Sequence, residues 1–202
     1  DFGVYSYTTT AVYIAVMVAQ TGLPTVLLRF VTEYRAKLEV QRLLSLLSWG
    51  RRLLVAATSL SLAGLLLWYL LDPGLNRGIL PALLLIPIMA DGAVRSGILR
   101  GLGQPLLGLL PEQTVRPLFH FLILAALGAL AHWRPARLDV VGALWVFVAA
   151  LSAAWLIGAY WLRRELRQDP VAESTVSRIE DGIIWRRSLL PILLMGAAQT
   201  LN

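Results

Sequence analysis

The sequence predicts an all-α integral membrane protein with about five complete transmembrane helices and the start of a sixth. Of its 202 residues, 57% are hydrophobic and only 15% are charged, and the mean hydropathy is +0.69. A soluble domain carries about 25% charged residues, so this chain has too few charges to cover a soluble surface. Apolar segments near the length needed to cross a bilayer, about 20 residues, recur along the chain. The basic residues cluster in alternate connections between these segments.

We expect the apolar segments to be helices, because membrane-spanning backbone must satisfy its own hydrogen bonds and the segments are long and rich in Leu and Ala. The first runs from Val4 to about Leu28 and is interrupted by threonines, Gln20 and Pro24. The second, Leu53–Leu71, is the most uniformly apolar. Asp72-Pro73-Gly74 is a turn signal that ends it.

The third segment runs from Ile79 to about Leu99, and the fourth, Pro117–Trp133, is short and opens with proline. The fifth, Val140–Leu162, is the longest, and a sixth begins near Leu189. Between the first two segments, Thr32–Leu47 has the alternation of an amphipathic helix, which we expect to lie at the membrane surface.

The basic residues divide unevenly between the two sides of the predicted bundle. One side holds Arg77, Arg134 and Arg137. The other holds 15 of the 18 Lys and Arg residues: Arg29, Arg35, Lys37, Arg42, Arg51, Arg52, Arg95, Arg100, Arg116, Arg163, Arg164, Arg167, Arg178, Arg186 and Arg187. The positive-inside rule makes the richer side cytoplasmic. The first segment then runs inward, so we expect a further span upstream and interpret the chain as an internal piece of a longer protein.

Enzyme signatures are scarce. The chain has no Cys, which excludes disulfides, thiolate nucleophiles and Cys-ligated metals. It also has no HExxH, GxSxG or Walker motif. His120 and His132 have no carboxylate partner at helical spacing, so we expect no metal, no cofactor and no catalysis. The arginines alternate with spans, so nucleic-acid binding is not expected either.

Charges within or near the spans are the better functional candidates, because they are costly in lipid and usually face a bundle interior or water. Asp91 and Arg95 are four residues apart, so they share a helix face and can pair, and Asp91 lies about 18 Å from the outer helix end. The same spacing relates Arg29 to Glu33 and Glu112 to Arg116. These pairs either sit at the interface and set orientation, or line a cationic, water-filled cavity. On the second interpretation the candidate substrate-binding residues are Asp91, Arg95, Arg29 and Arg100.

Prolines and glycines in the spans allow structural or functional interpretations. Proline frees a backbone carbonyl and can kink a helix, so it can act as a transporter hinge or simply be tolerated. The three prolines concerned are Pro24, Pro81 and Pro87. Small residues allow close helix approach, which is the role expected of Gly97, Gly101 and Gly108.

Several stretches resemble Wzx-type polysaccharide flippases, which belong to the multidrug/oligosaccharidyl-lipid/polysaccharide (MOP, MATE-like) exporter superfamily. The similar stretches are Phe2-Gly3-Val4-Tyr5-Ser6, Gly22-Leu23-Pro24-Thr25, Arg29-Phe30-Val31-Thr32-Glu33-Tyr34-Arg35-Ala36-Lys37, Leu99-Arg100-Gly101-Leu102-Gly103, Leu110-Pro111-Glu112-Gln113, Arg116-Pro117-Leu118 and Trp185-Arg186-Arg187-Ser188-Leu189-Leu190-Pro191. The resemblance places the segments as spans two to six and the start of seven, out of 12 or 14. It implies a partial first-lobe bundle at 1–167, a cytoplasmic inter-lobe linker at 168–187 and the truncated start of a second-lobe bundle at 188–202.

The function implied by this resemblance is the flipping of a polyprenyl-diphosphate-linked oligosaccharide across the cytoplasmic (inner) membrane by alternating access. The product would serve cell-surface polysaccharide or lipopolysaccharide assembly, with other assembly proteins as partners and H⁺ or Na⁺ as a conceivable coupling ion. The alternative is a cation-coupled multidrug exporter, which acidic residues in the bundle would favour. A membrane glycosyltransferase would need larger outer loops than those at 72–78 and 134–139, and a membrane scaffold is the remaining option.

Overall fold

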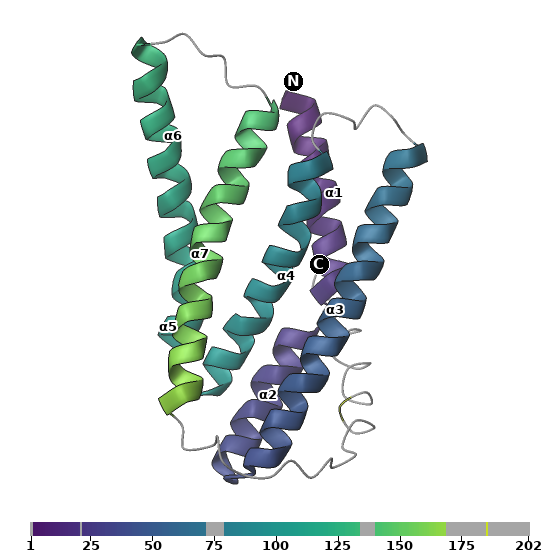
Figure 1. Cartoon of the computed structure of the whole chain (residues 1–202), viewed down its shortest axis with the longest axis vertical. Coiled ribbons are helices and arrows are strands. Elements are labelled where there is room, and N and C mark those ends of the chain that lie inside the picture. Colours follow the sequence, from purple (N-terminus) through teal and green to yellow (C-terminus); the bar gives the residue numbers. More distant parts are fainter. Residues whose placement is uncertain (1, 21, 72–78, 134–139, 169–184, 186–202) are drawn as a thin grey trace, which may run out of the picture.

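The computed structural model describes residues 2–20, 22–71, 79–133, 140–168 and 185, and every regular element within these ranges is a helix (Figure 1). The elements are α1 (Phe2–Gln20), α2 (Leu23–Ala36), α3 (Val40–Leu71), α4 (Ile79–Gly101), α5 (Pro105–Leu110), the π-helical turn η2 (Pro111–Val115), α6 (Arg116–Trp133) and α7 (Val140–Gln168). Four helical stretches in the described part are long and apolar enough to cross a membrane: Ser6–Ala36, Val40–Leu71, Leu80–Gly101 and Val141–Arg167. The chain is therefore an all-α, multi-pass membrane protein, as its composition predicts.

The first predicted span is two helices that meet at a break. Gly22 caps α2 with a left-handed backbone (φ 66°), a conformation that glycine adopts without steric cost. Pro24 follows in the first turn of α2, where its missing N–H would have no helical partner in any case. The stretch also continues to Ala36, beyond the predicted end at Leu28, so Phe30, Val31 and Tyr34 are core residues.

The amphipathic helix predicted at Thr32–Leu47 is wrong, because the chain reverses in the middle of it. The amide of Glu39 donates to the carbonyl of Tyr34 (2.9 Å), and the amide of Leu38 donates to Arg35 (3.2 Å). These are the two bonds that close a helix with a left-handed residue, here Leu38 at φ 56°. The polar residues that suggested a surface helix lie around a turn between α2 and α3.

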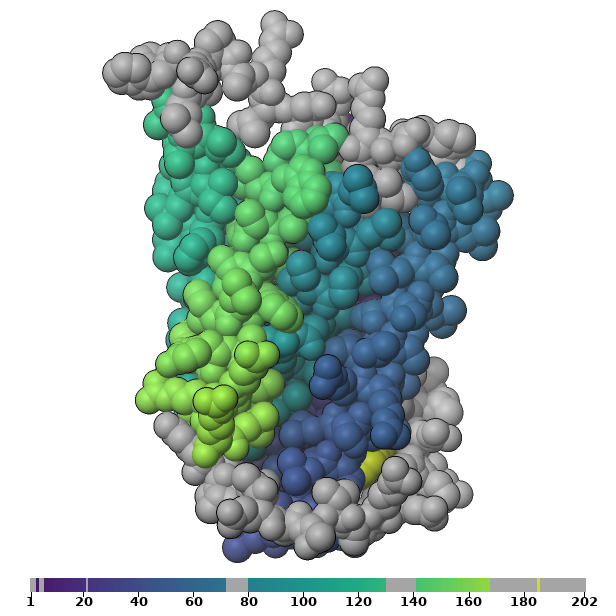
Figure 2. Space-filling view, in the orientation of Figure 1, coloured from purple at the N-terminus to yellow at the C-terminus, as the bar shows by residue number. Residues whose placement is uncertain are grey.

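Helix α4 is the central element, since it contacts α1, α2, α3, α5 and α7. It runs between α3 and α7 in Figure 1 and is visible between them on the face drawn in Figure 2. Its contact with α2 is close: a Cβ on Gly97 would lie 2.5 Å from the Pro24 carbonyl oxygen, and one on Gly101 would lie 2.8 Å from the Val31 side chain. The predicted packing role of both glycines is confirmed by this geometry.

The fourth predicted span begins earlier than Pro117. After a turn at 102–104, α5, η2 and α6 follow one another without a break from Pro105 to Trp133. Pro117 lies inside the first turn of α6, preceded by helical residues, so it does not open the segment. This stretch is not among the four that meet the length and hydropathy requirements for a span, so the count of five complete spans exceeds what composition supports in the described residues.

The outermost helices carry their apolar side chains outward. Leu60 and Leu67 of α3 and Phe121 of α6 are more than half exposed. Such a surface suits lipid, which requires no polar coat. The predicted domain boundary cannot be followed here, because the described structure ends at Gln168 except for Trp185, and the predicted start of the sixth segment at Leu189 lies outside the described residues.

Candidate functional site

The largest candidate site is a cavity of about 650 Å³ among α3, α4 and α7. This volume lies within the usual range for small-molecule sites. The cavity lies towards the end of the bundle that holds the α2–α3 and α4–α5 turns, which the basic residues mark as the predicted cytoplasmic side. Its lining residues are Leu27, Leu47, Arg51, Leu54, Pro87, Ile88, Asp91, Val94, Arg95, Ile98, Trp155, Leu162, Arg163 and Leu166.

Asp91 and Arg95 meet on the wall of this cavity. The Arg95 Nε lies 2.7 Å from Asp91 Oδ2, so the pairing predicted from their spacing is confirmed. Their side chains are 19% and 30% exposed, for Arg95 and Asp91 respectively. The pair is thus partly shielded, and its attraction is stronger than that of a fully solvated surface pair.

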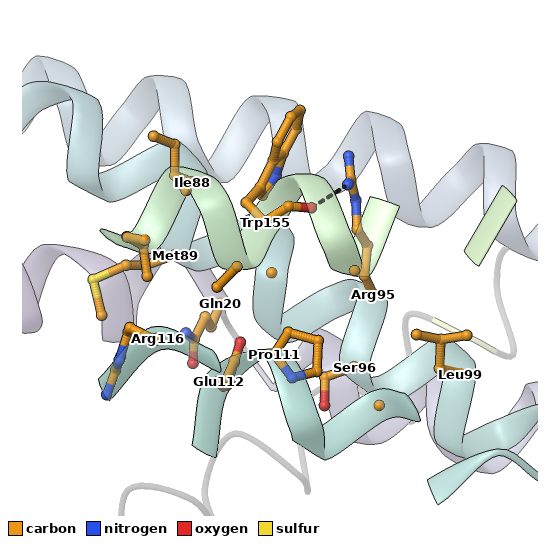
Figure 3. Close-up of a pocket in the computed structure, with 15 residues that line it drawn as sticks. Gln20, Ile88, Met89, Arg95, Ser96, Leu99, Pro111, Glu112, Arg116 and Trp155 are labelled. Atoms are coloured by element: carbon orange, nitrogen blue, oxygen red, sulfur yellow. Dashed lines mark hydrogen bonds between the residues drawn. The ribbon is translucent and has the colours of Figure 1, made fainter. Parts of the chain in front are cut away.

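Trp155 of α7 completes the arrangement and links both charged residues across the helix interface. Its indole N–H donates to Asp91 Oδ2 (2.6 Å), and its ring lies under the Arg95 guanidinium, 4.2 Å from Cζ to the ring centroid. Arg95 also donates to the Trp155 carbonyl oxygen at 3.4 Å (Figure 3). One residue therefore supplies a hydrogen bond, a cation–π contact and a backbone acceptor.

The sequence analysis missed Trp155. It treated the aromatic residues of the segments as interfacial, whereas this one lies in the middle of α7, away from both ends. Its central position was the available signal, because a tryptophan far from an interface needs a buried partner for its N–H.

The cavity carries a net positive lining. Arg51 of α3 and Arg163 of α7 join Arg95, and Asp91 is the single carboxylate among the lining residues. Asp91 is already paired with Arg95, so two further arginines lack a matching carboxylate on the cavity wall. Arginine presents a planar donor fork that binds phosphate or carboxylate in two places at once, so this wall suits an anion.

A second, smaller pocket lies on the other side of Arg95 (Figure 3). Its volume is about 70 Å³, enough for a few water molecules and too small for a sugar. Ile88, Arg95 and Trp155 line both spaces and so form the partition between them. The remaining lining residues are Gln20, Met89, Gly92, Ser96, Leu99, Gly108, Pro111, Glu112, Arg116, Leu151, Ala154 and Gly158.

The π-helical turn η2 borders this small pocket. Such turns are rare insertions in helices and often occur at functional sites. Glu112 belongs to it and is half-buried. A Cβ on Gly92 of α4 would lie 3.2 Å from Glu112 Oε1, so the carboxyl occupies the space that this glycine leaves open.

Two of the four predicted site residues lie away from both spaces. Arg29 and Arg100 are exposed and line neither the cavity nor the small pocket. Arg29 stacks on its neighbour Phe30, 5.7 Å from the ring centroid. Their part in substrate binding stays a prediction.

The other predicted pairs differ in outcome. Glu33 lies 2.6 Å from Lys37, and this hydrogen-bonded contact raises the pKa of the Lys37 ammonium. Glu112 and Arg116 both line the small pocket, and Arg116 also lies 5.9 Å from the Phe147 ring.

Neither histidine forms part of a metal centre in the portion of the chain that is described. His120 packs edge-on against Phe147, with the ring centroids 5.8 Å apart. The described residues contain no group of three His, Asp or Glu side chains that could hold a metal ion. The side chain of His132 lies outside the described part.

Comparison with known proteins gives one match. A family model described as "Polysaccharide biosynthesis protein" matches residues 1–201, nearly the whole chain. No curated protein and no solved structure matches this sequence.

Proposed function

The chain belongs to the polysaccharide biosynthesis protein family, and from this premise we propose that it flips a lipid-linked oligosaccharide across the cytoplasmic membrane. The substrate class is a sugar unit joined to a polyprenyl lipid through a diphosphate. The observation that carries the proposal is the cavity among α3, α4 and α7, whose wall holds Arg51, Arg95 and Arg163 against the single carboxylate of Asp91.

The chemistry of such a substrate matches the three surroundings that the structure offers. Its diphosphate requires arginine donors in a wet space, which the cavity wall supplies. Its polyprenyl tail can remain in lipid beside the apolar outer faces of the bundle. Its sugar unit is polar and needs a cavity of several hundred Å³, a requirement that the small pocket does not meet.

Asp91 has a different role from the arginines in this proposal. By pairing with Arg95 it keeps the guanidinium charge compensated while the cavity is empty. An incoming diphosphate then competes with Asp91 for the donors of Arg95, so the charge does not have to be stripped of all partners at any stage. The arginine excess also disfavours the alternative of a cation-coupled multidrug exporter, because a cationic drug would need carboxylates on this wall.

Transport in reconstituted vesicles tests the proposal. The full-length protein is placed in liposomes that contain a labelled polyprenyl-diphosphate oligosaccharide, and the label reaching the opposite leaflet is measured over time. Arg95→Ala and Asp91→Ala should each impair flipping without preventing membrane insertion, which is checked by yield and by helical content. Wild-type flipping by both variants would overturn the role of this cavity.

The double variant Asp91→Ala/Arg95→Ala separates binding from simple charge balance. It removes both charges, so neither is left without a partner. If the pair serves only structure, the double variant should flip substrate as well as the wild type. If Arg95 binds the diphosphate, the double variant should stay impaired.

A further inference from the structure

The small pocket holds a carboxyl group that the substrate cavity does not use. We propose that Glu112 is a proton-exchange site and that its protonation strengthens anion binding in the neighbouring cavity. The anion part of this inference rests on the proposed function, whereas the proton site does not. A carboxyl at the level of the middle of α4 is costly in a membrane protein, and such groups mark proton or ion pathways.

The surroundings of Glu112 fit reversible protonation. Gln20, Glu112 and Arg116 gather on one side of the pocket, with Arg95 and Trp155 on the other (Figure 3). The volume of about 70 Å³ admits a few water molecules, which can deliver and remove a proton.

Two charged groups face Glu112 across this pocket. Arg116 comes from the same continuous helix and Arg95 comes from α4. The pocket residues from α1, α5 and α7 carry no titratable side chain. His120 lies one turn beyond Arg116 and packs against Phe147, and it is not among the lining residues. Two arginines facing one carboxylate disfavour a metal cation at this position, so the proton is the ligand that fits.

Protonation changes the charge seen by Arg95. A proton from water converts the Glu112 carboxylate into a neutral carboxylic acid, so the facing groups lose one negative charge. Arg95 is shared with the large cavity, where the positive potential then rises. An anion there binds more tightly, and by reciprocity an anion bound in the cavity favours proton uptake by Glu112.

Infrared titration of the purified full-length protein tests the proton site without any substrate. The carbonyl-stretch band of a protonated carboxyl is followed from acid to alkaline pH in the wild type, Glu112→Gln and Glu165→Gln. Glu165 lies on α7 outside both spaces and serves as the matched control. A titrating band that is lost in Glu112→Gln and kept in Glu165→Gln supports the site. The same band in all three proteins would overturn it.

Binding of inorganic pyrophosphate, a soluble stand-in for the diphosphate, tests the coupling. In the wild type, affinity should fall about fivefold relative to Glu112→Gln as pH rises through the titration of Glu112, a low value for coupling between sites. Comparison at each pH removes the protonation of pyrophosphate itself. Parallel pH profiles in both proteins would overturn the coupling. Failure of pyrophosphate to bind the wild type would count against the proposed substrate, while the infrared result would still decide the proton site.

A second pair of variants guards against misfolding of Glu112→Gln. Gly92→Ala puts a methyl group 3.2 Å from Glu112 Oε1, whereas a Cβ on Gly64 meets nothing within 4 Å. The first substitution should move the midpoint of the carboxyl band and Gly64→Ala should not. An unmoved midpoint in Gly92→Ala would show that the titrating carboxyl lies elsewhere.

Discussion

The two sides of α4 have opposite characters. On the side facing α2, Gly97 and Gly101 bring the helix backbones together and leave no space for another atom. On the side facing α7, Asp91 and Arg95 meet Trp155, with a cavity on one side of them and a small pocket on the other. One helix thus anchors the bundle through small residues and carries the candidate site through charged residues. The comparison teaches that the polar side depends on the dry side to hold it in place.

The dry side should show the largest effect on stability. Gly97→Ala places Cβ 2.5 Å from the Pro24 carbonyl oxygen, so α2 and α4 must separate. We expect a loss of about 1–3 kcal/mol, typical of overpacking. Thermal unfolding in detergent measures it, with Gly64→Ala as control because its Cβ meets nothing within 4 Å. Equal stability of the two variants would show that this interface adapts without cost.

The polar side should show a smaller effect on stability and a larger one on transport. Trp155→Leu removes the donor to Asp91 and the ring under Arg95, while Trp155→Phe keeps the ring and removes only the donor. The lost hydrogen bond to a charged group is worth about 1.5–3 kcal/mol, which sets the scale for loosening the pair.

Transport kinetics distinguish positioning from packing at this tryptophan. We expect KM for the lipid-linked substrate to rise about tenfold in Trp155→Leu, with an intermediate value in Trp155→Phe. A fall in folded yield with unchanged KM would assign Trp155 to packing alone.

The smallest effects should come from the exposed arginines. Arg51→Gln and Arg163→Gln each remove one charge from the cavity wall, so we expect a few-fold loss of pyrophosphate affinity that shrinks at high salt. Arg29→Gln and Arg100→Gln are matched controls, because these residues lie outside the cavity. A larger loss in the second pair would restore the sequence-based assignment and extend the site beyond the cavity.

Trp185 illustrates a contact that sequence spacing could not reveal. It is buried (3% exposed), donates to the Tyr34 hydroxyl at 2.9 Å and packs against Trp49, with 5.4 Å between ring centroids. These partners lie far back along the chain, so helical periodicity carries no information about the contact. The predicted Asp91–Arg95 pair was accessible to sequence analysis because both residues belong to one helix and i,i+4 geometry is fixed.

The boundaries of the elements show the same division. The ends of α3 at Leu71 and of α4 near Gly101 agree with the apolar segments within a few residues. The turn at Leu38 did not, because a non-glycine residue in a left-handed conformation gives no compositional signal. The division of the first span at Gly22 was similarly hidden within an apolar run.

The sequence by itself determined the class of protein, the apolar segments and the one-sided distribution of arginines, because these depend on composition and on the length of helix that a bilayer requires. Tertiary structure alone decided which charges face a common space. Arg51, Arg95 and Arg163 come from three helices, and Trp155 reaches Asp91 and Arg95 from α7. Which charges gather depends on how the helices are rotated and brought together, and that rotation is set by packing contacts such as Gly97 against Pro24.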